Sequence, residues 1–382
     1  MTATSTLHDV AHRGSDRVYH LISADSHVNE PPDLWTSRVA AKFADRAPRM
    51  EHFEEGDGWV VEGVADPLPI GLSACAGQEP ELRRVWVRFE DIRQGGWDPA
   101  ARIKEIDRAG IDAEVLYPSP RLGNALFATA DRDLHVALVR AYNDWLGDYV
   151  EHDLSRFRAL PILPNWGQDL ALAEIERIGD RPSTGGFLIG GFPGGTLVPQ
   201  REDDLVFANL AERRLPLHVH VSLSLTPPVV RVSNSLPAGT GSHRFAGAAE
   251  PLLAMILSGV FDRHPGLRVV FAEVDCGWVP YFKEQIDDGY LRYRFRYDIP
   301  NFPSHYVRQN AYFTYVTDGY GIDNRDRIGV DRIMWSSDYP HGNSNYPDAW
   351  SPVKASMSGV SDSDRTAILS GNAIDLYRFG RS

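Results

Sequence analysis

Several short apolar runs in this sequence end in side chains that can bind a metal ion or move a proton. These side chains are Asp25, His27, His220, Glu273 and Asp338. Pro340 cannot donate a hydrogen bond to a sheet, so the last of these runs must end as a strand at about Asp338. Imidazoles and carboxylates that meet in one place make ligands for a borderline divalent ion with positions left open for water or substrate. Taken singly, each residue has a plainer explanation, such as an aspartate that caps a loop or a histidine that packs in the core.

The elements that carry these residues alternate between two kinds of periodicity. Short apolar runs predict strands at residues 20–25, 113–117, 158–163, 186–189, 215–220, 267–273, 312–316 and 333–336. Apolar residues at helical spacing predict helices at residues 99–109, 131–152, 170–178, 204–213, 248–260, 278–297 and 362–376. Eight buried strands that alternate with helices predict a (β/α)₈ barrel, in which the strand ends converge on one face. An open doubly wound sheet is the alternative, but no Gly-x-Gly-x-x-Gly motif follows the first strand.

Composition limits the classes of partner. The formal charge of -13 argues against nucleic acid or an anionic membrane surface as a partner. No apolar run reaches the ~18 residues that span a bilayer. Cys75 and Cys276 are the only cysteines, which fits a reducing cytoplasm. The sequence therefore predicts a cytoplasmic protein that acts on a small molecule, and we also expect a homo-oligomer, most simply a dimer.

Two regions lie outside the regular alternation. Residues 1–17 are polar and lack an apolar core, so we expect a disordered N-terminal tail before a barrel at residues 18–382. Residues 31–98 form a long irregular stretch rich in Pro, Gly and Trp. A connection of this length is usually functional or an added subdomain. We interpret it as a cap over the barrel mouth or as a subunit contact.

Three segments resemble the amidohydrolase-2 (amidohydrolase-related) branch of the amidohydrolase superfamily, which includes the aminocarboxymuconate-semialdehyde decarboxylase-like enzymes. The segments are Ile22-Ser-Ala-Asp-Ser-His-Val-Asn-Glu-Pro31, Leu215-Pro-Leu-His-Val-His220 and Met334-Trp-Ser-Ser-Asp-Tyr-Pro-His341. The resemblance extends over about residues 20–377. It implies a distorted (β/α)₈ TIM barrel, with a long irregular insertion after strand one, that binds a divalent ion.

The resemblance assigns four metal ligands by position. It implies that Asp25, His27 and His220 are ligands and that Asp338 is both a ligand and the proton carrier. Zinc is the favoured ion and manganese the alternative. The bridging lysine of dinuclear members is absent, since no lysine lies between residues 105 and 282, and a mononuclear site follows.

Three further residues lie near these ligands in the sequence or at a strand end. Glu273 stands where the family often has a catalytic histidine. His218, two residues before His220, can orient that residue as an outer partner of the site. Glu30 is close enough in sequence to compete as a ligand, but it lies in a loop. We therefore expect Asp338, Glu273 and His218 to take part in catalysis.

The reaction class stays open between two uses of one metal. The acidic first ligand resembles the family's decarboxylases, which favours non-oxidative decarboxylation of a small aromatic or unsaturated carboxylic acid. The alternative is hydrolysis of an amide, ester or lactone by a water that the metal activates. A catalytically silent binding barrel is a remote third interpretation.

Three residues are candidates for holding the substrate. Arg121 and Arg244 can each form a forked pair with a carboxylate. Such arginines are more often solvated or paired with structural acids. His341 is the third candidate, since it follows Asp338 by three residues.

Overall fold

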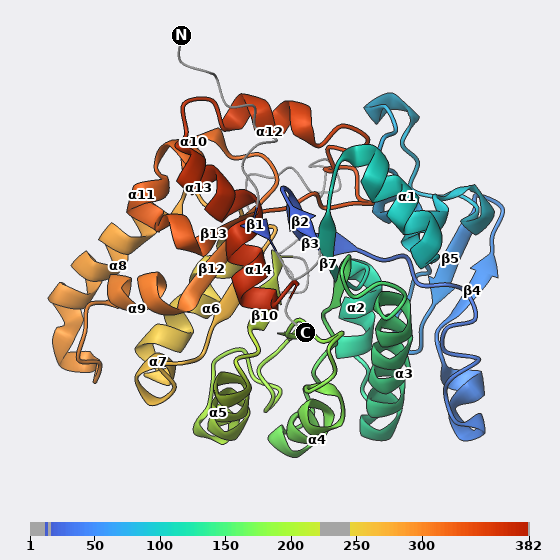
Figure 1. The fold of residues 1–382 in the computed structure, drawn as a ribbon. Helices are drawn as coiled ribbons and strands as arrows, with labels where there is room; N and C mark the ends of the chain where they lie inside the picture. Colours follow the sequence, from blue (N-terminus) through green and yellow to red (C-terminus); the bar gives the residue numbers. More distant parts are fainter. Residues whose placement is uncertain (1–11, 14–16, 222–244, 381–382) are drawn as a thin grey trace, which may run out of the picture.

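Parallel strands form the centre of the computed structural model, which describes residues 12–13, 17–221 and 245–380 (Figure 1). In chain order they are β3 (Ile22–His27), β7 (Ala113–Tyr117), β8 (Phe157–Ala159), β9 (Phe187–Leu188), β10 (Leu217–His220), β11 (Val269–Ala272), β12 (Ala311–Tyr315) and β13 (Ile333–Trp335). Each pairs in parallel with its neighbour in two sheets, β3-β7-β8 and β9-β10-β11-β12-β13. The predicted parallel arrangement is confirmed.

Backbone hydrogen bonds close the two sheets into a distorted barrel. Beyond the end of β8, the Leu163 N–H donates to the Leu188 carbonyl of β9 at 2.9 Å. On the other side, the Asp338 N–H donates to the Asp25 carbonyl of β3, also at 2.9 Å. The first and last strands are therefore joined next to two of the predicted site residues. The predicted (β/α)₈ barrel is confirmed.

Helices follow most of the strands and surround the barrel (Figure 1). They are α1 (Pro99–Ala109), α2 (Pro120–Phe127), α3 (Arg132–Val150), α4 (Gln168–Ile178), α5 (Asp204–Arg213), α6 (Ala246–Leu257), α7 (Val260–Arg263), α8 (Val279–Tyr293), α9 (Pro303–Asn310), α10 (Gly319–Asp323), α11 (Arg325–Ile328), α12 (Trp350–Ser356), α13 (Asp362–Thr366) and α14 (Asn372–Tyr377). The predicted bounds of α1 and α5 are confirmed. The predicted C-terminal helix is instead α13 and α14, joined by a π-helical turn at Ala367–Gly371.

Helix α1 shows why some bounds could be predicted. The Asp98 side chain accepts the Ala101 N–H at 2.9 Å, and Pro99 occupies the first turn, where no backbone donor is needed. Gly110 ends the helix with φ +76°, a conformation that glycine adopts without steric cost. Helices α2 and α9 also begin with a proline but have only eight residues each, and the apolar pattern missed them.

Two predicted strand ends need correction. Strand β3 runs from Ile22 to His27, so Asp25 and His27 belong to the strand itself, and the predicted strand at residues 20–25 was set too early. Strand β13 ends at Trp335, three residues before Asp338. The turn after Trp335 is bound to the neighbouring strand, since the Ser337 N–H donates to the Ser23 hydroxyl at 2.8 Å. The last predicted site residue therefore lies on a tightly held turn.

The insertion at residues 31–98 is more regular than predicted. It contains an antiparallel sheet of β4 (Arg49–His52), β5 (Asp57–Val60) and β6 (Leu68–Pro69), which lies beside α1 and α3 in Figure 1. Within the predicted N-terminal tail, β1 (His12–Arg13) pairs with β2 (Val18–Tyr19), and residues 1–11 and 14–16 lie outside the described part. The insertion thus has its own hydrogen-bonded framework, which a composition rich in Pro and Gly had concealed.

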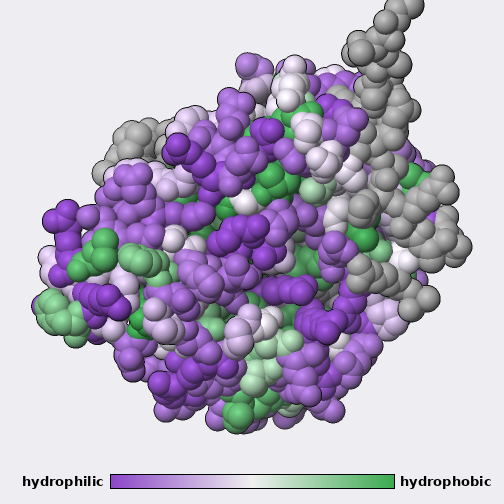
Figure 2. Space-filling view, turned by 60° about the vertical axis from the view of Figure 1, so that its left-hand side comes forward, coloured by the Kyte–Doolittle hydropathy of each residue, from purple (hydrophilic) through white to green (hydrophobic). Residues whose placement is uncertain are grey.

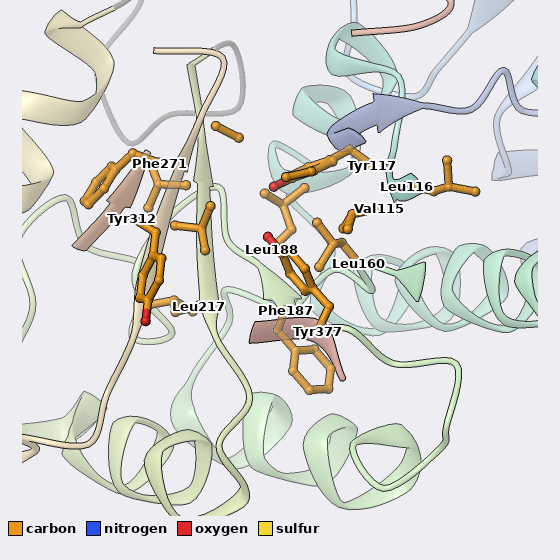
Figure 3. Close-up of a cluster of buried hydrophobic side chains, with 14 of the residues drawn as sticks. Val115, Leu116, Tyr117, Leu160, Phe187, Leu188, Leu217, Phe271, Tyr312 and Tyr377 are labelled. Carbon is orange, nitrogen blue, oxygen red and sulfur yellow. The ribbon is translucent and has the colours of Figure 1, made fainter. Parts of the chain in front are cut away.

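The barrel interior is filled with large side chains. Figure 3 shows Tyr117, Leu160 and Leu188 packed close to Tyr377, which comes from the C-terminal helix α14. All four residues are at most 2% exposed. These residues fill the interior of the barrel. The polar side chains of the predicted site gather at the carboxyl ends of the strands, on one face of the barrel.

The polarity of the surface is relevant to the prediction that the protein has no membrane partner. Figure 2 shows a face on which hydrophilic side chains predominate and hydrophobic ones are interspersed. No helix of the described residues is long and apolar enough to cross a membrane. Tyr281 and Phe295 are 70% and 81% exposed, so they lie on the outside of the barrel. The homodimer and the cytoplasmic location stay predictions.

A buried ion pair joins α1 to the strands. Arg102 of α1 and Glu114 of β7 are both fully buried, and Nε lies 2.6 Å from the carboxylate oxygen Oε2. Arg102 also donates to the carbonyls of His27 and Tyr339 at 2.9 and 3.4 Å. Ser26 of β3 donates to the other Glu114 oxygen at 2.9 Å. One guanidinium therefore binds the end of β3 and the turn that follows β13.

We expect Arg102→Met to lower the free energy of unfolding by about 3–5 kcal/mol, because Glu114 would remain as an unpaired buried charge. The double variant Arg102→Met/Glu114→Gln leaves no such charge and should lose less. Urea unfolding measures both. As a control, Arg292→Met removes the exposed pair with Asp288 and should leave the free energy of unfolding almost unchanged. Equal losses for the buried and exposed pairs would contradict this account.

Candidate active site

Four predicted ligands converge at the barrel mouth. Asp25, His27, His220 and Asp338 are all fully buried. His27 Nε2 lies 3.4 Å from Asp25 Oδ1 and 3.4 Å from Asp338 Oδ1. His220 Nε2 lies 3.6 Å from Asp25 Oδ1. We call these four residues the ligand cluster.

Hydrogen bonding fixes the orientation of His27. Its Nδ1 lies 2.7 Å from the Pro118 carbonyl, which can only accept, so Nδ1 carries the proton and Nε2 presents a lone pair. Burial holds the pKa of His27 well below its usual range, and the nearby His341 and His220 lower it further. A neutral, oriented imidazole is the form that binds a metal ion.

The ligand cluster is electrostatically incomplete among the described residues. His27 Nε2, Asp25 Oδ2 and Asp338 Oδ2 are buried and have no hydrogen-bond partner there. Buried polar atoms without partners are costly, and two carboxylates in one buried site repel each other. A divalent cation would satisfy all three atoms, and the mixture of oxygen and nitrogen donors suits such an ion. These residues therefore fit a metal ion.

The backbone aims two of the acids by an uncommon conformation. Asp338 has φ +54° and Glu273 has φ +57°, both in the left-handed region that non-glycine residues seldom adopt. The Glu273 N–H is held by the Thr314 hydroxyl at 2.9 Å. Such conformations persist where the surroundings impose them, and they concentrate at functional sites.

Glu273 borders the ligand cluster. Its Oε2 lies 3.7 Å from His220 Nε2, and its Oε1 accepts a hydrogen bond from Asn343 at 3.2 Å. The structure therefore brings Glu273 to the site at the tip of β11, as predicted. Asn343 was not predicted, because an asparagine in a loop carries no periodic signal that would place it here.

His341 lies against the cluster and pairs with Asp338. Its Nδ1 is 2.7 Å from Asp338 Oδ1, and its ring stacks on His27 with centroids 4.0 Å apart. Burial alone would lower the pKa of His341, but the carboxylates of Asp338, Glu273 and Asp25 outweigh it and raise the pKa. The 2.7 Å contact places the His341 ring where it can exchange a proton with Asp338. The predicted role of His341 in holding the substrate stays a prediction.

His218 lies one layer deeper in the barrel. Its Nδ1 is 2.7 Å from the Tyr117 hydroxyl, and its ring stacks on Tyr377. Burial, with a smaller effect of His220, lowers the pKa of His218 to about 3, so the ring stays neutral. Tyr117 in turn packs against His220, with ring centroids 5.4 Å apart. Tyr117 was not singled out from the sequence, because it looked like an ordinary strand residue.

Glu30 and Arg121 lie beside the cluster. Ser119 donates to both carboxylate oxygens of Glu30, from its N–H at 3.0 Å and from its hydroxyl at 2.6 Å. Burial raises the pKa of Glu30 to about 7, although Ser119 opposes this. Arg121 is exposed and lines the same cavity as Glu30. Arg244 lies outside the described residues, so its predicted role stays a prediction.

Comparison with known proteins identifies the family. A family model described as Amidohydrolase matches residues 24–379. The chain belongs to this amidohydrolase family. As predicted, the protein is a metal-dependent enzyme of the superfamily, a carboxy-lyase or a hydrolase.

Relatives support the predicted branch of this amidohydrolase family. A gamma-resorcylate decarboxylase from Polaromonas sp. (strain JS666) is 27% identical over 317 residues, 79% of this chain and 91% of that protein. A 2-amino-3-carboxymuconate-6-semialdehyde decarboxylase from Dictyostelium discoideum is 25% identical over 205 residues, 53% of this chain and 54% of that protein. The predicted resemblance to this branch is confirmed.

Solved structures agree on the fold of this amidohydrolase. An amidohydrolase from Mycobacterium avium subsp. paratuberculosis K-10 superposes with a TM-score of 0.71 at 24% identity, covering 94% of this chain and 98% of that chain. A dihydroxybenzoic acid decarboxylase from Polaromonas sp. JS666, with bound manganese and the inhibitor 2-nitroresorcinol, gives 0.65 at 22% identity, covering 95% and 98%.

We expect Tyr117→Phe to destabilise the protein by about 1–3 kcal/mol, because it leaves His218 Nδ1 buried without a partner. Urea unfolding at neutral pH measures the change. Tyr320 is 69% exposed, and Tyr320→Phe is the matched control, with an expected change within about 0.5 kcal/mol. If the two variants were equally stable, the Tyr117–His218 hydrogen bond would contribute nothing to the free energy of unfolding.

Proposed function

We propose that this enzyme removes CO₂ from a small aromatic carboxylic acid without oxidation, with one divalent ion held by Asp25, His27, His220 and Asp338. The observation that carries the proposal is the buried ligand cluster, in which His27 Nε2, Asp25 Oδ2 and Asp338 Oδ2 have no hydrogen-bond partner among the described residues. Relatives named as decarboxylases of aromatic acids support this reaction over hydrolysis. Hydrolysis of an amide, ester or lactone is the alternative with the same cluster.

The choice of metal rests on donor chemistry. Two imidazoles suit zinc, and two carboxylates suit manganese, so the cluster fits both ions. The dihydroxybenzoic acid decarboxylase that resembles this fold contains manganese. When bound, the ion would supply positive charge that offsets the repulsion between the buried acids and the carboxylate of the substrate.

The proton must reach the carbon that loses CO₂, and we assign this task to Asp338. Asp338 Oδ1 is bound to His341 Nδ1, so His341 can return a proton to Asp338 after each turnover. Asp338 gives its proton to the ring carbon that carries the carboxylate. The bond between that carbon and the carboxylate then breaks, and its electron pair restores the ring as CO₂ leaves. One proton is consumed for each CO₂ released.

The remaining predicted residues take supporting roles in this proposal. Glu273, beside His220, is positioned to orient the substrate or to act as a base in the hydrolytic alternative. His218 touches Tyr117 rather than the cluster, so we assign it a positioning role through Tyr117. Arg121, at the cavity rim, can pair with an anionic group of the substrate.

We expect metal analysis of the purified protein to find one zinc or manganese ion per chain. His27→Ala should reduce the bound metal at least about tenfold, because it removes an oriented donor from the centre of the cluster. His135→Ala is the matched control: His135 is equally buried, and its Nδ1 binds the Leu126 carbonyl. Full metal occupancy in His27→Ala would remove His27 from the ligands. Absence of metal from the unmodified protein would favour the silent barrel.

Isotopic labelling distinguishes the two reactions. Decarboxylation in D₂O should place deuterium where the carboxylate was, whereas hydrolysis in H₂¹⁸O should place ¹⁸O in a new acid or alcohol. We expect deuterium and no ¹⁸O, measured by mass spectrometry of the product. Asp338→Asn should lower turnover by at least about 10²–10⁴-fold, since it removes the proton carrier. Incorporation of ¹⁸O without deuterium would replace the carboxy-lyase by the hydrolase.

A further inference from the structure

The last helix of the chain, α14, sends an aromatic side chain into the interior of the barrel. Tyr377 is the final residue of this helix and is 2% exposed. Figure 3 shows its ring packed close to Leu188 and Tyr117, which belong to barrel strands. The end of the chain is therefore part of the barrel core rather than an outer layer on it.

The backbone at the end of α14 is held in place by Arg158 of β8, which is 5% exposed. Its Nε donates to the Tyr377 carbonyl at 3.1 Å, and its Nη2 donates to the Arg378 carbonyl at 3.0 Å. The guanidinium also lies over the Phe379 ring, 4.5 Å from the centroid. Because three successive residues are bound to one strand, the Tyr377 side chain starts from a fixed point.

Tyr377 supports His218 on one side, and Tyr117 binds it on another. The His218 ring stacks on the Tyr377 ring, with centroids 5.7 Å apart and an interplanar angle of 28°. The Tyr117 hydroxyl lies 2.7 Å from His218 Nδ1. Gly186 leaves space for the imidazole, because a Cβ there would lie 2.9 Å from His218 Nε2. Interiors packed this closely transmit a displacement of one side chain to its neighbours.

Tyr117 connects this layer to the ligand cluster. Its ring lies 5.7 Å from the His27 ring and 5.4 Å from the His220 ring, measured between centroids. We call Tyr377, His218 and Tyr117 the ring series. Contacts between rings therefore run from the last helix to both histidines of the ligand cluster.

We propose that Tyr377 is a positioning residue, which acts through the ring series and holds His27 and His220 in the orientation that a metal ion requires. This inference rests on the proposed function for the identity of the bound group, a divalent ion. Loss of a partner that orients a metal ligand typically weakens metal binding by about 10–100-fold. Tyr377 reaches the ligands through other rings, so we expect an effect at the lower end of this range.

Metal affinity tests the role of Tyr377 without requiring turnover. Titration of the metal-depleted protein with Mn²⁺, in competition with a chelating indicator, gives the Kd. Tyr377→Leu removes the stacked ring and should raise this Kd about tenfold. Tyr377→Phe keeps the ring and should leave the Kd nearly unchanged. Circular dichroism checks that each variant is folded, and Tyr377→Met, which keeps an unbranched side chain, replaces Tyr377→Leu if the latter does not fold.

Leu376→Ala is the matched control. Leu376 is the preceding residue of α14 and is 3% exposed, but successive side chains on a helix point roughly 100° apart, so it does not point where Tyr377 points. Leu376→Ala should lower the free energy of unfolding and leave the Kd for Mn²⁺ unchanged. Equal weakening of metal binding by Leu376→Ala and Tyr377→Leu would reduce the effect to general destabilisation and overturn the inference. Unchanged binding in Tyr377→Leu would overturn it as well.

Histidine NMR separates this inference from the proposed function. In metal-free protein labelled with ¹³C at histidine Cε1, Tyr377→Leu should shift the resonances of His27 and His220, and Leu376→Ala should not. The resonance of His218 is left out of the comparison, because loss of the stacked ring changes its shift directly. These shifts, with no Mn²⁺ or Zn²⁺ bound by the unmodified protein, would support the positioning role and contradict the metal-dependent reaction. Metal binding and release of CO₂ that Tyr377→Leu does not alter would do the reverse.

Discussion

The ion pair between Arg102 and Glu114 is the interaction on which the geometry of the site depends. Removal of two charges from water is expensive, and the cost is offset only when the pair is close and its remaining hydrogen-bonding positions are satisfied. Here the carboxylate also accepts from Ser26, and the guanidinium donates to backbone carbonyls. Those carbonyls belong to His27, a member of the cluster, and to Tyr339, which follows Asp338 in the sequence. The position of the cluster is therefore tied to a rigid, buried pair that takes no part in the chemistry.

The cluster itself is the reverse of that pair. Asp25 and Asp338 bring two carboxylates into a buried place. Their Oδ2 atoms have no hydrogen-bond partner among the described residues. Folding alone would favour apolar residues there, because two buried carboxylates destabilise the folded state. Binding of a cation would offset this loss of stability. A ligand that binds only the folded state stabilises it in proportion to its concentration and affinity. A metal ion held by the cluster would therefore stabilise the folded barrel.

The insertion forms part of the wall of a cavity next to the barrel strands. Barrel enzymes place their chemistry at the strand ends and vary the loops around it. In this chain the strand ends supply the cluster, whereas Trp59 and Phe89 of the insertion supply the apolar side of the neighbouring cavity. Glu30 stands between the two regions. The cluster and the apolar wall of the cavity therefore come from different segments of the chain.

The sequence by itself determined the barrel and indicated that Asp25, His27, His220 and Asp338 meet on one face of it. It could do so because strands and helices have distinct periods, and because parallel strands must present their ends on one face. It also placed α1 within its observed bounds, since capping residues act locally. The predicted strand at residues 20–25 was set too early, because pairing with the distant strand β7 sets the bounds of β3.

Tertiary structure alone decided which groups touch. The pairing of His341 with Asp338, the layer that His218 shares with Tyr117, and the Ser119 contacts of Glu30 join residues whose spacing carries no signal. Burial decided their protonation as well: it lowers the pKa of His218 to about 3 and raises that of Glu30 to about 7. The physical reason is that solvent exposure and electrostatic neighbours are properties of the packed chain. The residue types were set by the sequence, and their chemistry was set by what surrounds them.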